Sequence, residues 1–429
     1  MGRQKFASAH HTSVRCAVLL TMLATAALPG AASAQDPVLE WNTHLNTAVL
    51  AGGTGPLPAT RVTALVQAAV FDAVNGIARR YPSIHVAPKG HGGASQEAAA
   101  IQAAYAMLVR IYPLQAGTLL TKRNASIGAL GLSRGEESRG AVERGVAWGQ
   151  EVADAIWAWR STDGFAPNPP PPFRGAAVNG VWRPTPPANL DGAGPNFATM
   201  TPWVLERPSQ FRPGPPPALT SARYTADYNE VKDWGGAVGS LRSADQDVLS
   251  VFWTANTPLN WNRVASQLLA ADGSSMLERA RVLGLVNVAM ADAAIGCWDA
   301  KYRYVYWRPI TAINAADDGN PDTVSDPTFT SWIVTPNHPD YTSGHSCVSS
   351  AAAGVLAARY GENTTTTFNS EALLNGNPIP DRTFHSFTEV LDEIFIARIY
   401  GGIHFRTACE EGAGIGRKVA AYVMQRLDK

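Results

Sequence analysis

The sequence is poor in cysteine, and its four cysteines form none of the usual zinc-binding patterns. No Cys-x-x-Cys pair and no His-Glu-x-x-His motif occurs, so a zinc site is not expected. Net charge is also missing, because 35 basic residues balance 35 acidic ones. This balance gives no reason to expect nucleic acid or an anionic membrane surface as a partner.

Long apolar runs are absent from the body of the chain. After residue 34 no segment reaches the roughly 18 consecutive apolar residues of a membrane helix, so no stable membrane anchor is expected. Residues 1–34 have the pattern of a secretory signal, with a basic start, an apolar segment from Cys16 to Leu28 and the small-x-small sequence Ala32-Ser33-Ala34. We therefore expect a secreted or periplasmic protein that is cleaved near Ala34.

Alternating strand patterns are nearly absent, apart from the short run over residues 302–307, and we find neither heptads nor a repeat of about 20–50 residues. Helical periodicity dominates instead, and 429 residues that are 45% hydrophobic can bury a large core. The predicted fold class is all-α, built as packed helical bundles. The expected helices cover residues 62–77, 98–111, 114–127, 134–159, 244–253, 261–271, 275–298, 343–359, 387–400 and 409–427.

Proline is concentrated in one segment, residues 165–217, which also contains Trp182 and Trp203. A flexible linker is one interpretation, but the interleaved aromatic and apolar residues favour an ordered, irregular loop packed on the surface. Such a loop often forms a wall of an enzyme's site. We divide the chain into a signal (1–34), an N-terminal helical region that includes this loop (35–240) and a second helical region (241–429).

The segment 336–356 joins a proline-punctuated loop to a predicted buried helix. Thr342 or Ser343 is the natural N-cap of this helix, and Gly344 allows another group to approach the backbone closely. His345 then projects from the first turn. The free N–H groups of a helix start form an anion site, although a capped core helix with an incidental histidine is the alternative.

Two further segments place cationic groups where an apolar core would not favour them. Lys301 and Arg308 end an otherwise apolar helix, and Arg398 lies on a helix shortly before His404. Taken singly, each cation is explained by a long side chain that reaches solvent, and the histidine by a loop contact. Taken together with the helix start at residue 343, they form a cage for a tetrahedral oxyanion.

These segments closely resemble the signature shared by vanadium-dependent haloperoxidases and type 2 phosphatidic-acid/acid phosphatases. The order Lys-x6-Arg-Pro, then Ser-Gly-His, then Arg-x5-His is the same. The flanking residues around Trp253, Asn262 and Asp292 resemble the fungal and bacterial chloroperoxidase-like branch. The resemblance covers roughly residues 245–425.

By this resemblance the protein is an exported haloperoxidase that uses vanadate and hydrogen peroxide to oxidise a halide to hypohalous acid, with a small organic acceptor as a further partner. His404 would bind vanadium, and His345 would act as acid and base. The residues expected to hold the vanadate oxygens are Lys301, Arg308, Ser343, Gly344 and Arg398. Trp298 and His338 would flank the halide. Algal bromoperoxidases have histidine at the position of His338, so we expect bromide to be preferred over chloride.

Three positions differ from the family pattern. Thr342 replaces the usual proline before Ser-Gly-His, and Ala397 replaces the usual serine before Arg398. The acid that usually follows the second histidine by four residues is also missing, because that position is Ala408. A carboxylate normally orients a ligand imidazole, so Glu410 or Glu411 from the next helix is the candidate substitute.

Two other functions fit the same residues. In a secreted acid phosphatase, His404 would be the nucleophile and His345 would protonate the leaving group, since vanadate bound to histidine mimics the phosphoryl-transfer transition state. A non-catalytic oxyanion-binding protein is the third hypothesis. Vanadate reconstitution with a bromide and peroxide assay, beside a phosphate-ester assay, separates the three.

Three cysteines remain after signal cleavage, so at least one of them lacks a partner within the chain. Cys347 and Cys409 each lie close in sequence to a site histidine, on segments that have to meet. A disulfide between them is our hypothesis, and two buried free thiols are the alternative.

Overall fold

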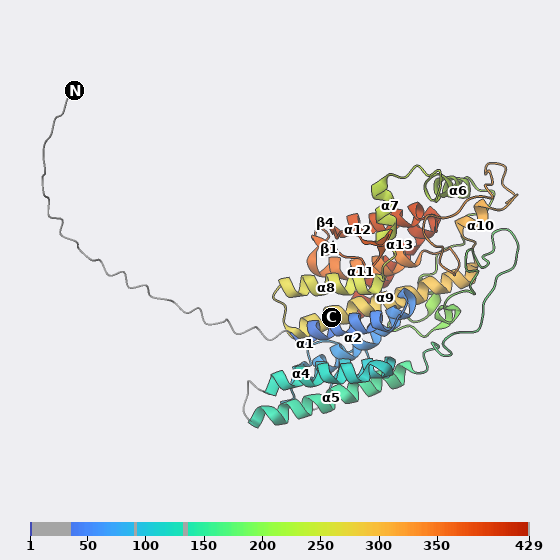
Figure 1. Ribbon diagram of the computed structural model, residues 1–429. Helices are drawn as coiled ribbons and strands as arrows, with labels where there is room; N and C mark the ends of the chain where they lie inside the picture. The colour runs from blue at the N-terminus through green and yellow to red at the C-terminus, as the bar shows by residue number, and fades with distance from the viewer. Residues whose placement is uncertain (2–35, 90–91, 132–135, 428–429) are drawn as a thin grey trace. The chain divides into compact units, whose positions relative to one another are not determined.

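The computed structural model describes Met1 and residues 36–89, 92–131 and 136–427. These residues contain thirteen α-helices and only four short strands, which confirms the all-α prediction (Figure 1). The expected signal peptide lies, apart from its first residue, outside the described residues. Gln35–Lys429 form one compact unit, so the proposed division at residue 240 stays a prediction.

The helices of the N-terminal part are α1 (Pro37–Ala51), α2 (Pro56–Ala78), α3 (Gln96–Ile111), α4 (Ala116–Gly131), α5 (Glu136–Arg160) and α6 (Ala222–Trp234). Those of the C-terminal part are α7 (Ala244–Phe252), α8 (Thr257–Ala271), α9 (Met276–Tyr304), α10 (Pro309–Ile313), α11 (Gly344–Tyr360), α12 (Phe387–Tyr400) and α13 (Arg406–Leu427). The strands are β1 (Thr366–Phe368), β2 (Leu373–Leu374), β3 (Asn377–Pro378) and β4 (Arg382–Phe384). β1 pairs antiparallel with β4, and β2 pairs antiparallel with β3.

Short polar side chains set the starts of many helices. Ser343 caps α11, since its side chain accepts a hydrogen bond from the backbone N–H of Ser346. α9 runs further than predicted and ends at Val305, which adopts a left-handed conformation with φ of 49°. The expected strand over residues 302–307 is therefore wrong: its first half is helix, and Tyr306 forms only an isolated bridge with Val181.

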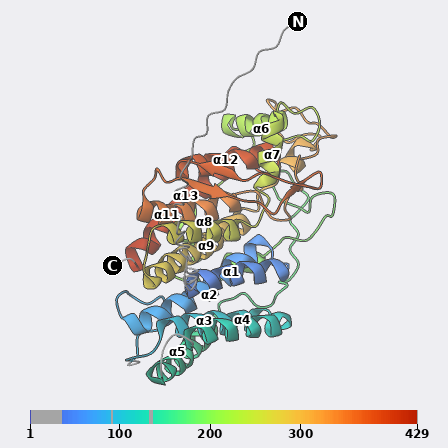
Figure 2. The same ribbon diagram turned by 60° about the vertical axis from the view of Figure 1, so that its left-hand side comes forward.

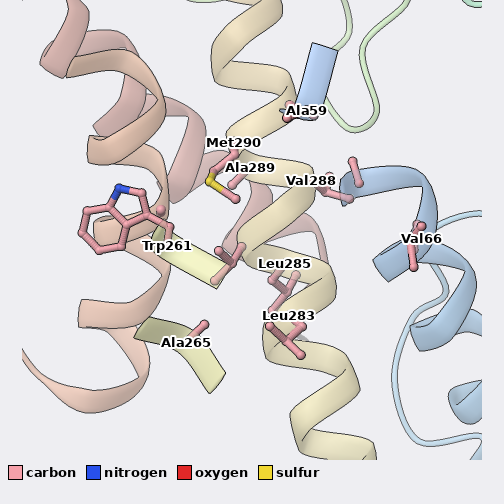
Figure 3. Packing of buried hydrophobic residues seen from close by; sticks show 14 of the residues in the cluster. Ala59, Val66, Trp261, Ala265, Leu283, Leu285, Val288, Ala289 and Met290 are labelled. Atoms are coloured by element: carbon pink, nitrogen blue, oxygen red, sulfur yellow. The ribbon is translucent and has the colours of Figure 1, made fainter. Parts of the chain in front are cut away.

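α9 is the central helix of the core. It is buried along most of its length between α2 and α8, and Figure 3 shows Leu283, Leu285 and Met290 among the apolar side chains of this contact. α2 and α9 are long and apolar enough to span a membrane. Their most apolar windows are 89% and 94% buried inside the protein, which accounts for this composition.

Two groups of four helices repeat one packing arrangement. α1, α2, α3 and α5 contact one another in the same pairs as α8, α9, α11 and α13. The two groups meet along α2 and α9, which lie side by side in both ribbon views (Figures 1 and 2). Across this interface α1 contacts α9 and α2 contacts α8. If α1 corresponds to α8 and α2 to α9, each of these contacts is the counterpart of the other, as a two-fold relation requires.

Buried polar residues repeat between the two groups. Asn42 on α1 is bonded to Gln67 on α2 (2.7 Å), and Asn262 on α8 is bonded to Asn287 on α9 (2.9 Å). In both pairs the partners are 25 residues apart, and a tryptophan precedes the asparagine. In each pair one side-chain amide donates to the other in the apolar interior, which is consistent with the same positions staying polar in both groups.

A buried aspartate follows each of these pairs at the same interval along the chain. Asp72 on α2 accepts hydrogen bonds from three backbone N–H groups of residues 84–86, each at 2.8 Å. Asp292 on α9 accepts three from residues 203–205, at 2.6–2.9 Å. Each aspartate therefore ties an irregular loop to the helix core of its own group.

Glycines bring the last two helices of each group close together. A Cβ added to Gly149 on α5 would lie 2.3 Å from the carbonyl oxygen of Ala99, and one added to Gly416 on α13 would lie 2.3 Å from that of Cys347. With the polar pairs and the aspartates, this shows that the two groups are copies of one four-helix unit.

The proline-rich segment 165–217 is an ordered, irregular loop, as predicted. It contains two short 3-10 helices, Pro195–Thr199 and Pro208–Phe211, and it buries Trp182 and Trp203. The backbone carbonyl of Ala193 in this loop accepts a hydrogen bond from the indole of Trp298 (3.0 Å). The loop therefore reaches the region of the predicted site.

The close approach of α13 to α11 is testable with two glycines on one helix. Gly416→Ala should lower the free energy of unfolding by about 1–3 kcal/mol, because its Cβ collides with the backbone of α11. Gly414→Ala meets no atom within 4 Å and should raise it by about 0.5–1 kcal/mol through helix propensity. Denaturant unfolding measures both, and equal effects would contradict the packing.

Candidate active site

Lys301 lies in the last turn of α9 and is fully buried. Its ammonium group donates hydrogen bonds to the backbone carbonyl oxygens of Pro339 (2.7 Å) and Asp340 (3.0 Å). Burial lowers the pKa of Lys301 to about 8, because the charged form loses its hydration. The lysine thus joins α9 to the loop that precedes α11.

Arg308 precedes α10 and is also fully buried. Its guanidinium donates to the backbone carbonyl oxygens of His338 (2.8 Å) and Ile403 (2.5 Å), and its Nη2 lies 2.9 Å from Nδ1 of His338. Nδ1 of His338 also lies 3.2 Å from the carbonyl oxygen of Pro339, which can only accept a hydrogen bond. Burial lowers the pKa of His338 well below its ordinary value, so its ring is neutral. Arg308 thereby connects the loop before α11 with the loop before α13.

His404 lies in the turn between α12 and α13, and the turn depends on Gly402, whose φ is +74°. Nδ1 of His404 is 2.7 Å from Oδ1 of Asp340, a fully buried carboxylate. Burial, with the charge of Arg308 next in size, lowers the pKa of His404 well below its ordinary value. The ring is therefore neutral, Nδ1 donates to Asp340, and Nε2 carries the lone pair.

His345 lies in the first turn of α11, as predicted, and Ser343 rather than Thr342 is the N-cap. The backbone of Trp253 accepts a hydrogen bond from the ring, while the buried Nε2 has no partner among the described residues. Burial, followed by the charge of Arg398, lowers the pKa of His345 well below its ordinary value. A neutral ring with a free lone pair is suited to take up a proton.

Arg398 lies on α12 and is buried. Its Nη2 donates to the backbone carbonyl oxygen of Ser250 at 3.3 Å, and its Nε has no partner in the described part of the chain. Burial lowers the pKa of Arg398 to about 10, so the side chain remains a cation at neutral pH. No carboxylate contacts it in these interactions, which leaves its charge available to an anion.

One cavity of about 600 Å³ brings most of the predicted site together. The predicted residues in its wall are Trp298, His338, Gly344, His345, Arg398 and His404. Three others are not part of the wall. Lys301 and Arg308 hydrogen-bond to backbone carbonyls of the loops that form it, and Ser343 uses its backbone N–H for the carbonyl of Ala408 (2.8 Å).

The expected halide neighbours also lie together. The rings of Trp298 and His338 are 5.0 Å apart, centroid to centroid. Because the indole N–H of Trp298 donates to Ala193, it is not available to a halide. Of these two rings, that of His338 is the candidate hydrogen-bond donor to a halide, and it donates from Nε2 in the tautomer in which Nδ1 accepts from Arg308.

The donor set fits an oxyanion and not a bare metal cation. Three buried cations surround the histidines, and no group of three or more His, Cys, Asp or Glu side chains suitable for a cation occurs among the described residues. Nε2 of His345 and Nε of Arg398 are buried and unpaired there. A tetrahedral anion such as vanadate would supply acceptors for them, with Nε2 of His404 as its ligand.

The comparisons with known proteins agree with this chemistry. Residues 281–429 match the family profile of the VCPO second helical-bundle domain. Vanadium chloroperoxidase of Curvularia inaequalis is 26% identical over 354 residues, which is 63% of this chain and 58% of that protein. The chain is thus similar to vanadium haloperoxidases.

Solved structures of haloperoxidases support the same assignment. The crystal structure of a bacterial vanadium-dependent iodoperoxidase is 28% identical, covers 91% of this chain and 96% of its own, and superimposes with a TM-score of 0.77. A holo-type bacterial vanadium-dependent chloroperoxidase is 16% identical with a TM-score of 0.68, which shows the shared fold. The chain spans less than two thirds of the length of the Curvularia inaequalis protein.

The sequence analysis did not identify the carboxylate that contacts Nδ1 of His404. Glu410 and Glu411 are exposed, and Glu410 is paired with Arg223 (2.6 Å). Asp340 takes the position instead, from the loop before α11. An acid inside a proline-rich, otherwise uncharged loop is the signal that could have indicated it.

The predicted disulfide between Cys347 and Cys409 is also wrong. All three cysteines are free and buried. Cys347 lies beside Cys297, and both thiols contact the hydroxyl of Thr342 at 3.6 and 3.2 Å. The side chain of Cys409 is instead hydrogen-bonded to the serines at the start of α11.

Asp340→Asn should weaken vanadate binding by about 10–100-fold, the usual effect of removing a carboxylate behind a ligand imidazole. The amide keeps an acceptor for Nδ1 of His404 but loses the negative charge. Glu410→Gln is the matched control and should leave the affinity unchanged. Equilibrium dialysis with vanadate measures both, and equal losses in the two variants would contradict the role of Asp340.

Lys301 should make anion binding depend on pH. Its pKa of about 8 means that its charge is present below pH 8 and is lost as the pH rises through that value. At pH 6.5 Lys301→Gln should bind vanadate about 10–100-fold more weakly than the wild type, since a charged hydrogen bond contributes about 1.5–3 kcal/mol.

Above pH 8 this difference between wild type and variant should shrink. Comparing the two proteins at each pH cancels the titration of vanadate itself. Lys418→Gln, on the exposed surface of α13, should follow the wild type throughout. A difference that stays constant up to pH 9.5, about 1.5 units above the pKa, would contradict the argument.

Proposed function

We propose that this protein is an exported vanadium-dependent haloperoxidase that oxidises a halide with hydrogen peroxide. The proposal is supported by two neutral histidines and Arg398 in the wall of one cavity, with the buried cations Lys301 and Arg308 hydrogen-bonded to the loops of that wall. His404 has a lone pair on Nε2 because its Nδ1 is bonded to Asp340. His345 has a free Nε2 on the same cavity.

Each residue has a separate part in this proposal. His404 is the ligand, and Lys301, Arg308 and Arg398 compensate the charge of the oxyanion. Ser343 and Gly344 contribute the helix start. Bound vanadate supplies an electrophilic centre at which hydrogen peroxide becomes able to oxidise halide.

His345 accepts a proton from hydrogen peroxide as it binds and returns it to the oxygen that leaves as water. The overall reaction joins one peroxide oxygen to the halide: hydrogen peroxide, halide and a proton give hypohalous acid and water. The halide is oxidised by two electrons, and the O–O bond of the peroxide accepts them.

The halide would lie near Trp298 and His338. Histidine at position 338 supports bromide over chloride, by the resemblance to bromoperoxidases. The related iodoperoxidase structure supports including iodide, which is oxidised more easily than either. Export rests on the N-terminal sequence, and sequencing the mature N-terminus tests whether cleavage occurs near Ala34.

An acid phosphatase is the second candidate. Asp340 behind a neutral His404 also suits a nucleophile, since it would stabilise the imidazolium that forms when Nε2 attacks phosphorus. His345 would then protonate the leaving group. This function is favoured if the vanadate-loaded protein does not oxidise halide and the same protein hydrolyses phosphate esters once vanadate has been removed. Oxyanion binding without either activity would favour a non-catalytic role.

The two histidines should respond differently to substitution. His404→Ala should lose tight vanadate binding and bromide oxidation together, because it removes the ligand. His345→Ala should still bind vanadate, while turnover falls by roughly 10²–10⁴-fold, the usual contribution of a general acid and base. Equilibrium dialysis and a bromide oxidation assay on the same samples separate the effects.

The control for both variants is a far-UV circular dichroism spectrum that matches the wild type. Phosphate should compete with vanadate in the wild type, because both occupy the same tetrahedral cage. If His404→Ala keeps wild-type vanadate affinity and turnover, the proposed ligand is wrong.

Halide preference gives an independent prediction. The kcat/KM for bromide should exceed that for chloride at mildly acidic pH, and iodide should be oxidised at least as well as bromide. Steady-state assays with the three halides on one vanadate-loaded preparation measure this order. Equal or better chloride oxidation would count against the part given to His338.

A further inference from the structure

The cavity beside the histidines is larger and more apolar than peroxide and a halide require. Its volume of about 600 Å³ is many times the roughly 30 Å³ that a water molecule takes up in the liquid. It lies within the range of about 300–1,000 Å³ that is typical of sites for organic ligands. Away from the site residues, its wall includes Leu57, Pro58, Ala294, Ile333, Val334 and Val348.

The apolar wall comes from segments that are far apart in sequence. Leu57 and Pro58 begin α2 in the first helical copy, Val348 lies on α11 in the second, and Ile333 and Val334 belong to the loop before α11. Val334 is 74% exposed, so the apolar lining continues to the rim. These apolar side chains offer neither hydrogen bonds nor charge to a halide ion, while Thr60, Thr254, Thr257 and Asn337 also line the cavity. The apolar part of the wall favours an apolar molecule by removing its surface from water.

We propose that this cavity binds an apolar, electron-rich aromatic acceptor, which is halogenated there and not in free solution. The inference rests on the proposed haloperoxidase function. In the step, an aromatic carbon attacks the halogen of hypohalous acid and a carbon–halogen bond forms. The O–X bond breaks, and its electron pair leaves with hydroxide. The carbon then loses its proton, which converts the hydroxide to water.

Binding is tested first, without peroxide or halide. 2-Naphthol is titrated calorimetrically into the vanadate-loaded and the vanadate-free protein. Val334→Asp should weaken its binding by roughly tenfold, because a carboxylate at the rim retains its hydration and opposes an apolar ligand. Val324→Asp is the matched control, since Val324 is 68% exposed but does not line the cavity, and it should bind like the wild type.

The place of halogenation is tested by competition. Equal amounts of 2-naphthol and its sulfonated analogue are offered to the vanadate-loaded protein with bromide and peroxide, and separately to free hypobromous acid. The protein should give a higher share of brominated 2-naphthol than the free reagent does. With Val334→Asp, the share of brominated 2-naphthol should fall to that obtained with free hypobromous acid. The rate at which this variant consumes peroxide in the presence of bromide should equal that of the wild type.

The outcomes separate this inference from the proposed function. Absence of 2-naphthol binding to the wild type, or a product ratio equal to that of free hypobromous acid, overturns the acceptor site while leaving halide oxidation intact. Binding of 2-naphthol without any halide oxidation overturns the haloperoxidase function, and with it the halogenation step. Equal losses in the two valine variants would show that the effect is not located at the cavity.

Discussion

Three cationic side chains lie buried in the helical core, and among the described residues one buried carboxylate lies close to them. Lys301, Arg308 and Arg398 are almost fully enclosed, and Asp340 is the single buried acid among their contacts. Burying unpaired charge is costly, so backbone carbonyl oxygens have to solvate these groups. For Lys301 and Arg308 those carbonyls come from the loops before α11 and α13, which is consistent with both loops being irregular and yet ordered, whereas Arg398 donates to Ser250 on α7. The excess positive charge that remains is balanced only when an anion binds.

The same balance determines the state of the histidines. A second proton on His345 or His404 would add positive charge to an interior that already has an excess, and both rings therefore stay neutral. Neutral rings have lone pairs, and lone pairs are needed by a metal ligand, a base or a nucleophile. Asp340 and the backbone of Trp253 then decide which nitrogen carries the lone pair.

Sequence patterns predicted the helices well, because helices depend on local spacing, and the same local motifs pointed to residues that the structure brings to one region. The 3.6-residue period locates α9 and α11 to within a few residues, except where α9 continues past its apolar part to Tyr304. Asp340 was missed because its role depends on a contact 64 residues away in sequence, and no local spacing encodes it. The predicted disulfide between Cys347 and Cys409 was wrong for the same reason, because spatial neighbours that are distant in sequence leave no local pattern. The doubled helical unit was invisible because only a few buried positions, such as Asn42 and Asn262, recur in a sequence that has otherwise diverged.

The two copies of that unit have different surroundings at equivalent helix starts. Where α11 has Gly344 and His345, the matching first turn of α3 has Gln96 and Glu97, so only one copy offers room and positive potential to an anion. The other copy still contributes Leu57 and Pro58 to the cavity wall. The repeated arrangement thus separates two tasks that usually constrain each other in an active site. Substitutions at the start of α2 can change the shape of the cavity without disturbing the residues that hold the charge, so descendants of this fold can diversify in what they accept while keeping one chemistry.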